Sequence, residues 1–303
     1  MRRIVLLVVA VACCQAVQAA PLDSRQVCAN ARWLVHVDVD AMRESTLVEK
    51  AYLAGSQQWA ELEAWLAIAC DQVAVDPRFD LYGITMFGTK LGKLEGVALI
   101  HAKMRPEVMI ARAKEETGYR STPYGQREIH SWTDGQNCVA GAFQAPSLLV
   151  VARTDKEVQH ALDVLDGKAA CLAGKSSAGV GAAPKGTMLQ AWVQGLADTP
   201  LPVKSPAIKK SQALSLLVGE NAGEVVASAR LVMETGSIAN KVLAVLEGVR
   251  AAAELQYEDD PRIMEVVRKL KLSVSDKTVS VELHAGAEDV WTQVKQLFAK
   301  LRG

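Results

Sequence analysis

One order of predicted elements occurs twice in this chain, and this repetition limits the possible fold more than any single motif does. Residues 80–166 predict strand, strand, helix, strand, strand and helix, and residues 212–301 predict the same order. Apolar and polar residues alternate along the predicted strands, as Val279 and Val281 do with Ser280. The repeat therefore predicts an α+β fold built from a duplicated ββαββα unit, with helices packed on one face of an antiparallel sheet.

The predicted elements of the first unit are strands 81–87, 96–104, 126–133 and 138–152, the last with a break at Pro146, and helices 106–117 and 155–165. Those of the second unit are strands 213–219, 224–233, 270–275 and 278–284, and helices 236–255 and 287–301. Each unit ends in a helix whose apolar residues recur at helical spacing.

A strand and two helices precede the first unit, at 32–39, 40–53 and 56–70. Four residues of the third segment have the spacing of a core-facing helix side: Trp59, Leu62, Leu66 and Ala69.

Between the units, residues 174–186 are rich in glycine, alanine and serine and predict a loop or linker. We therefore expect an N-terminal half at 20–173 and a C-terminal half at 187–303.

Residues 1–19 have the features of a signal peptide. A basic start at Arg2 and Arg3 precedes an apolar run at 4–14, and small residues before Ala20 suit a signal peptidase. The apolar run is shorter than the roughly 20 residues that span a bilayer, and we expect no transmembrane span in the mature chain. The mature chain is thus predicted to be periplasmic or secreted. An alternative is a lipoprotein modified at Cys13, because residues 10–13 form a loose lipoprotein cleavage box.

Four cysteines remain after the predicted cleavage site: Cys28, Cys70, Cys138 and Cys171. An even number of cysteines in an oxidising compartment predicts disulfides, and four thiols allow three pairings. Pairing Cys28 with Cys70 and Cys138 with Cys171 closes loops of moderate length and is favoured here. None of the four has the neighbouring cysteine or histidine that zinc sites use, so no metal is expected.

Charge and motifs exclude several classes of function. The chain has 34 basic and 34 acidic residues and no tract of five like charges, so we expect no nucleic-acid partner. It lacks GxSxG, HExxH, CxxC and SxxK motifs, which excludes the readily recognised hydrolases, metalloproteases, redox proteins and penicillin-binding proteins. No cofactor and no catalytic residue is assigned.

The best candidate for chemistry is the group His36, Asp38 and Asp40. Alternation along a strand places the three side chains on one face, about 7 Å apart, where they resemble a hard-metal or general-base cluster. The alternative is structural: these residues face water beside an apolar strand face, and Asp40 caps the following helix.

Three segments resemble a family of secreted, uncharacterised α+β proteins abundant in planctomycete-type bacteria: WLVHVDVDAM at 33–42, DLYGITMFG at 80–88, and DVLDGK at 163–168 before a small-residue loop. The resemblance spans about residues 32–301. It implies export, a duplicated fold and a non-catalytic role, and it supplies no functional residue.

These observations predict an exported, non-enzymatic protein that binds an unknown protein or envelope component through a sheet face or a groove between the units. The alternative function is a secreted hydrolase or metal-dependent enzyme that uses the carboxylates and histidine around His36.

Overall fold

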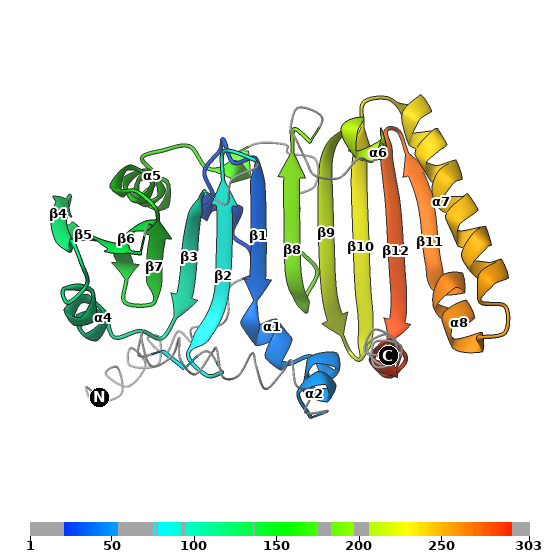
Figure 1. Cartoon of the computed structure of the whole chain (residues 1–303), viewed down its shortest axis with the longest axis horizontal. Coiled ribbons are helices and arrows are strands. Elements are labelled where there is room, and N and C mark those ends of the chain that lie inside the picture. Colours follow the sequence, from blue (N-terminus) through cyan, green and yellow to red (C-terminus); the bar gives the residue numbers. More distant parts are fainter. Residues whose placement is uncertain are drawn as a thin grey trace, which may run out of the picture.

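The computed structural model describes residues 21–53, 75–76, 78–91, 95–135, 137–174, 183–196 and 206–292. Within this part of the chain, twelve strands form a single antiparallel sheet in the order β11-β12-β10-β9-β8-β1-β2-β3-β7-β6-β5-β4 (Figure 1). The strands are β1 Trp33–Asp38, β2 Leu81–Gly88, β3 Val97–Ala102, β4 Arg120–Tyr124, β5 Arg127–Asp134, β6 Asn137–Ala145, β7 Leu148–Ala152, β8 Thr187–Gln194, β9 Ser211–Asn221, β10 Glu224–Met233, β11 Leu270–Ser275 and β12 Thr278–Gly286.

The helices are short except for α5 and α7. They are α1 Val39–Arg43, α2 Thr46–Leu53, α4 Pro106–Ala113, α5 Asp155–Leu165, α6 Pro206–Lys209, α7 Gly236–Gln256 and α8 Pro261–Lys269, with 3-10 turns η1 Ser24–Gln26 and η2 Leu172–Gly174. Residues 287–292 are also helical, and the rest of the helix predicted at 287–301 lies outside the described residues. The predicted signal peptide, the predicted helix 56–70 and most of the predicted linker lie outside them as well.

The sheet is organised about its central strands β1 and β8, which pair antiparallel with Val35 opposite Ala191. On one side β1 pairs with β2, and on the other β8 pairs with β9. In both directions the chain then makes a hairpin, and a later strand returns beside the hairpin's second strand: β7 beside β3, and β12 beside β10. The prediction of an α+β fold with an antiparallel sheet is confirmed.

Three details of the predicted unit differ from the structure. A further strand, β4, lies at one edge of the sheet, and the segment predicted as one broken strand at 138–152 forms two paired strands, β6 and β7. The predicted helix 106–117 ends at Ala113.

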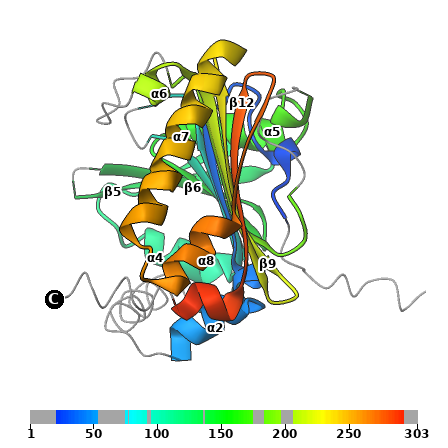
Figure 2. The same ribbon diagram turned by 90° about the vertical axis from the view of Figure 1, so that its right-hand side faces the viewer.

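The prediction that helices pack on one face of the sheet is wrong. Figure 2 shows α5 on one side of the sheet and α4, α7 and α8 on the other. Neighbouring residues of β7 explain the difference, because Val150 packs in the cluster that includes α5 whereas Leu149 packs in the cluster that includes Met109 of α4. A strand that is apolar on both faces requires cover on both faces.

The main core lies beneath α5. It joins α5 to β1, β2, β3, β5, β6 and β7, with Trp192 of β8 and residues Val27, Cys28 and Ala31 of the N-terminal segment. The capping box that the sequence predicts at Thr154 and Glu157 is present and begins α5. A smaller cluster under α7 contains Met233, Ala239 and Val279. Within the described part of the chain, no helix is both long and apolar enough to span a bilayer.

Candidate functional site

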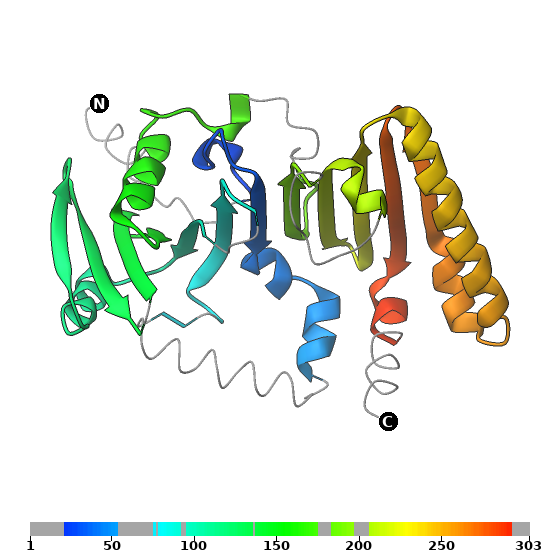
Figure 3. The same ribbon diagram turned by 45° about the horizontal axis from the view of Figure 1, so that its top comes forward.

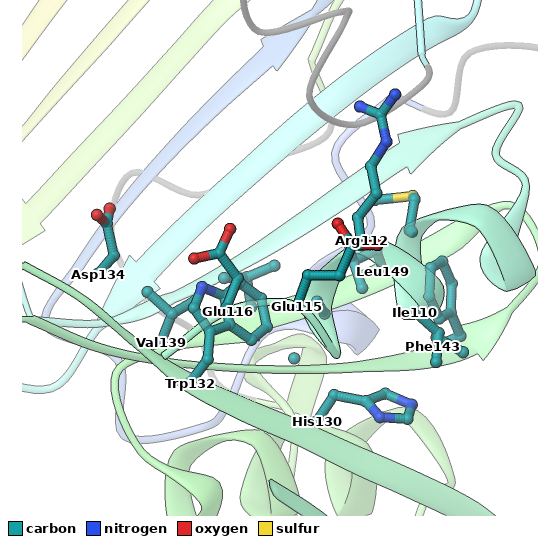
Figure 4. A pocket seen from close by; sticks show the side chains of 14 residues that line it. Ile110, Arg112, Glu115, Glu116, His130, Trp132, Asp134, Val139, Phe143 and Leu149 are labelled. Atoms are coloured by element: carbon teal, nitrogen blue, oxygen red, sulfur yellow. The ribbon is translucent and has the colours of Figure 1, made fainter. Parts of the chain in front are cut away.

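A cavity of about 620 Å³ lies between α4 and strands β5, β6 and β7, and we call it the α4 groove (Figure 4). Its floor is apolar and consists of Trp132, Val139, Gly141, Phe143, Leu149 and Val151. Figure 4 shows Trp132 and Val139 toward one end of the groove and Ile110 and Phe143 toward the other.

The groove exists because α4 is short and covers the sheet only in part, with Met109 in the same cluster as Phe143 and Leu149. Pro106 occupies the first turn of the helix, where its missing N–H costs nothing, and the helix ends at Ala113, with none of its eight residues buried. Met109, Ile110 and Ala113 therefore stay half-buried and form the wall opposite the apolar floor. An apolar space remains between the two surfaces.

The ionisable residues lie at the margin of the groove. Arg112, Glu115, Glu116 and Asp134 line it and are exposed, which gives three carboxylates and one guanidinium. The remaining polar residue, His130, is 5% exposed and shares a hydrogen bond of 2.8 Å between its Nδ1 and the Tyr119 hydroxyl. Burial lowers the pKa of His130, so the imidazole is neutral at neutral pH. The groove thus combines an apolar, uncharged interior with a rim of net negative charge.

The predicted residues His36, Asp38 and Asp40 line a second cavity, of about 480 Å³, together with Glu44 and residues 183–187. Their local contacts differ from those predicted. The strand ends at Asp38, and this residue caps α1, with a carboxylate oxygen 2.9 Å from the Ala41 amide that donates to it. The predicted cap at Asp40 is therefore wrong by two residues. Asp40 lies inside α1 and forms an ion pair with Arg43.

His36 does not face water, which corrects the structural alternative for this residue. It is 3% exposed, and its Nδ1 lies 2.9 Å from the Thr85 hydroxyl oxygen. Its Nε2 is buried and has no hydrogen-bond partner. Burial, reinforced by the neighbouring His101, lowers the pKa of His36 to about 4. Burial also raises the pKa of Asp38.

The described residues contain no group of three or more histidine, cysteine, aspartate or glutamate side chains arranged to hold a metal ion. Cys28, Cys138 and Cys171 are thiols, and Cys70 lies outside the described residues. Cys138 is exposed on β6 opposite Thr133, whereas Cys171 lies opposite Cys28.

Sequence reasoning missed the α4 groove. The residues 148–152 are all apolar, which indicates that β7 is covered on both faces, and Met109, Ile110 and Ala113 follow at helical spacing in a short segment. Those two patterns together indicate an apolar contact between a helix and the second face. No local pattern shows that the contact is incomplete.

The comparisons with known proteins are sparse. No family model and no curated protein matches the chain. Among solved structures it is similar to TP0453 in crystal form III, with 12% identity and a TM-score of 0.46 over 92% of this chain and 100% of that one. For TP0453 in crystal form I the identity is 12% and the TM-score 0.45, over 92% of this chain and 98% of that one.

Proposed function

We propose that this protein is an exported, non-enzymatic binding protein, and that its α4 groove accepts the apolar side chains of a basic segment of a partner protein. The observation that carries the proposal is a helix with no buried residue above an apolar strand face. Such a surface gains free energy when a partner removes it from water, at roughly 25 cal/mol for each Å² of apolar area.

The size and charge of the groove support a partner of this kind. Its volume of about 620 Å³ lies within the range of roughly 300 to 1,000 Å³ typical of ligand sites. The three rim carboxylates outnumber Arg112, so a positively charged segment meets a complementary field at the rim. Apolar anchors in the groove then provide affinity, while the rim provides orientation and a faster association rate.

The proposed duplication of the ββαββα unit gives the groove a structural origin. If the halves are copies, α4 corresponds to α7 and α8. Helix α4 follows β3, the second strand of one hairpin, and α7 follows β10, the second strand of the other. All three helices lie on the same face of the sheet (Figure 2). Helix α7 has 21 residues and α8 has 9, whereas α4 has eight. The shortened helix uncovers strand face that its counterpart covers, and a helical partner segment fits that place.

A filling substitution tests the proposal. Ala113→Phe places an aromatic ring in the groove, and Ala111→Phe puts the same ring on the exposed side of the same helix. A fluorescein-labelled amphipathic peptide of leucine and lysine is titrated by fluorescence anisotropy. We expect Ala113→Phe to weaken binding about tenfold or more, which is the loss of about 1.4 kcal/mol, and Ala111→Phe to leave it unchanged.

Two matched peptides separate the apolar contribution from the charge. A leucine and glutamate peptide and a serine and lysine peptide should both bind poorly, because one repels the rim and the other lacks anchors. Equal affinity of the leucine and lysine peptide for Ala113→Phe and Ala111→Phe would show that binding occurs elsewhere and would end the proposal.

The charged rim is tested by Glu115→Gln with Glu116→Gln. This double variant should bind the leucine and lysine peptide more weakly and with less dependence on salt, since two of three rim carboxylates are gone. Glu247→Gln, on the exposed surface of α7, is the control. An unchanged salt dependence in the double variant contradicts the proposed role of the rim.

His36 favours a second candidate function, hydrolysis in the cavity that it lines with Asp38. The specific observation is the buried Nε2 without a hydrogen-bond partner, since a neutral imidazole nitrogen can accept a proton from a water or a hydroxyl nucleophile. Turnover of 4-nitrophenyl esters that disappears in His36→Asn but persists in His284→Asn supports it. Turnover that is absent from the wild type, or equal in both variants, removes this candidate.

A further inference from the structure

We infer that Cys28 and Cys171 form an intramolecular disulfide when the protein meets a disulfide oxidant, and that this bond ties the N-terminal segment to the chain that follows α5. The two residues face each other in an isolated antiparallel bridge between residues that are 143 apart in the chain, at positions 28 and 171. Both are thiols in the structure, and both belong to the main core, Cys28 as a buried member and Cys171 at its margin.

The hydrogen bonds around the bridge define its geometry. The Ala29 amide donates to the Ala170 carbonyl over 3.0 Å, and the Leu172 amide donates to the Val27 carbonyl over 2.8 Å. Both bonds join the residues that flank the cysteines, so Cys28 and Cys171 form a non-hydrogen-bonded antiparallel pair. Such pairs have Cα atoms about 4.5 Å apart with the side chains at their closest, and disulfides need roughly 4.4 to 6.8 Å.

Burial determines the order of the chemical steps. Cys28 is 2% exposed, whereas Cys171 is only partly buried. The Cys171 thiolate attacks a small disulfide RSSR, forms a mixed disulfide and releases one thiolate RS⁻. The Cys28 thiolate then attacks the Cys171 sulfur and expels the second RS⁻. In total, two protein thiols lose two protons and two electrons, and RSSR is reduced to two RSH.

The structure distinguishes this bond from the pairing that loop lengths favour. Pairing Cys171 with Cys138 requires the start of β6 to meet the segment after α5, but Cys138 is exposed and lies opposite Thr133. Cys171 instead has Cys28 as its cross-strand neighbour. The bond closes a loop that contains β1 to β7 and α5, so it constrains the unfolded form of the whole first half.

The direct test is a peptide map of the wild-type chain after refolding in reduced and oxidised glutathione. The oxidised protein is unfolded, its thiols are alkylated, and it is then digested without reductant for mass spectrometry. We expect a linked pair of peptides that contains Cys28 and Cys171 and that separates on reduction. Alkylated Cys171, or a link from Cys28 to Cys70 or from Cys171 to Cys138, overturns the inference.

Stability provides a second readout that needs no digestion. In the variant Cys70→Ser with Cys138→Ser, which keeps only the inferred pair in the mature chain, oxidation should raise Tm by about 5 °C or more. Adding Cys171→Ser should abolish that rise. An equal Tm for the oxidised and reduced forms of the double variant contradicts the inference. The peptide map of the wild type decides the matter even where a serine variant does not fold, and neither measurement depends on the α4 groove.

Discussion

Helix α5 has 11 residues and buries four of them, whereas α7 has 21 residues and buries only Ala239. The difference lies in what each helix packs against. Helix α5 contacts β3, β5, β6, β7 and η1, which surround it with apolar residues, and α7 contacts β10, β11 and β12 at the edge of the sheet. Figures 1 and 3 show α7 along that edge.

Two ion pairs, one beside α5 and one on β10 and β12, differ in the same direction. Asp166, just after α5, accepts two hydrogen bonds from Arg127 over 2.8 and 3.0 Å and is 13% exposed, whereas Arg230 and Glu282 form an ion pair that is 57% and 36% exposed. The carboxylate of the first pair is thus enclosed, whereas both members of the second pair are open to water. Helix length alone is a poor guide to stabilisation, and position within the sheet determines it.

The largest expected effect comes from the cores beneath the two long helices. Leu162 of α5 is fully buried, so Leu162→Ala should lower the free energy of unfolding by about 3 to 4 kcal/mol through lost burial and an unfilled cavity. Val249 of α7 is 62% exposed, and Val249→Ala should change the free energy of unfolding by less than about 0.5 kcal/mol. Urea denaturation measures both. Similar losses in the two variants would break the comparison.

The next effect concerns histidines on strands. His36 has a pKa of about 4 in the folded chain against 6.5 for an unperturbed histidine, so the unfolded chain takes up a proton first as pH falls. Stability should therefore decrease by about 3 kcal/mol from this residue between pH 7 and pH 4, and His36→Asn should remove that part of the pH dependence.

The matched control is His284→Asn, because His284 lies on β12 in the second half and its side chain is 39% exposed. Urea denaturation at several pH values should give the control the pH dependence of the wild type. A His36→Asn variant that also keeps that dependence contradicts the burial of an uncharged imidazole.

A smaller effect is expected from the ion pairs. Asp166→Asn should cost about 2 kcal/mol at neutral pH, and Glu282→Gln less than about 1 kcal/mol, because water screens the exposed pair. Hydrogen bonds from Arg127, Lys168 and Gln144 hold the pKa of Asp166 well below its usual range. A carboxyl group whose pKa is lowered by folding stabilises the folded chain when the pH is above its pKa in the unfolded chain, which is about 4. This stabilisation is lost as the pH falls. The cost of Asp166→Asn should shrink below about pH 4, and a cost that stays constant there would exclude the electrostatic explanation.

The smallest expected effect is the difference between the N-terminal caps of α5 and α7. Thr154→Ala removes a capping box with Glu157 and should cost about 1 kcal/mol, whereas Thr235→Ala removes a single hydrogen bond to the Ile238 amide and should cost about 0.5 kcal/mol. Circular dichroism during thermal unfolding measures both. A larger loss for Thr235 would indicate that α7 stabilises the sheet more than its burial suggests.

Much of the fold follows from local patterns, because alternation and caps act over a few residues. The alternation in 278–284 predicts β12 to within two residues of its observed end, and Thr154 marks the start of α5. The strand β4 escapes prediction because Pro123 weakens its pattern, and it lies at the sheet edge, where a missing N–H is tolerated.

The sites depend on contacts between distant segments, which no local pattern encodes. Alternation correctly groups His36 with Asp38 along β1, and both line one cavity. The burial of His36 comes from elsewhere in the chain, since Thr85 and His101 belong to β2 and β3. The α4 groove likewise requires α4 to lie over β6 and β7, and the opposition of Cys28 to Cys171 requires the chain to return after α5.

The central place of β1 has a consequence for how this protein is made. Among the described residues β1 is the first strand, yet its two neighbours are β2 and β8, and the last residues of β8 are encoded more than 150 codons later. During synthesis from the N-terminus, one edge of β1 has no native partner until residue 194 has left the ribosome. About half of the chain is thus synthesised while this edge of β1 has unpaired N–H and C=O groups, and a chaperone that shields the edge has that interval in which to act.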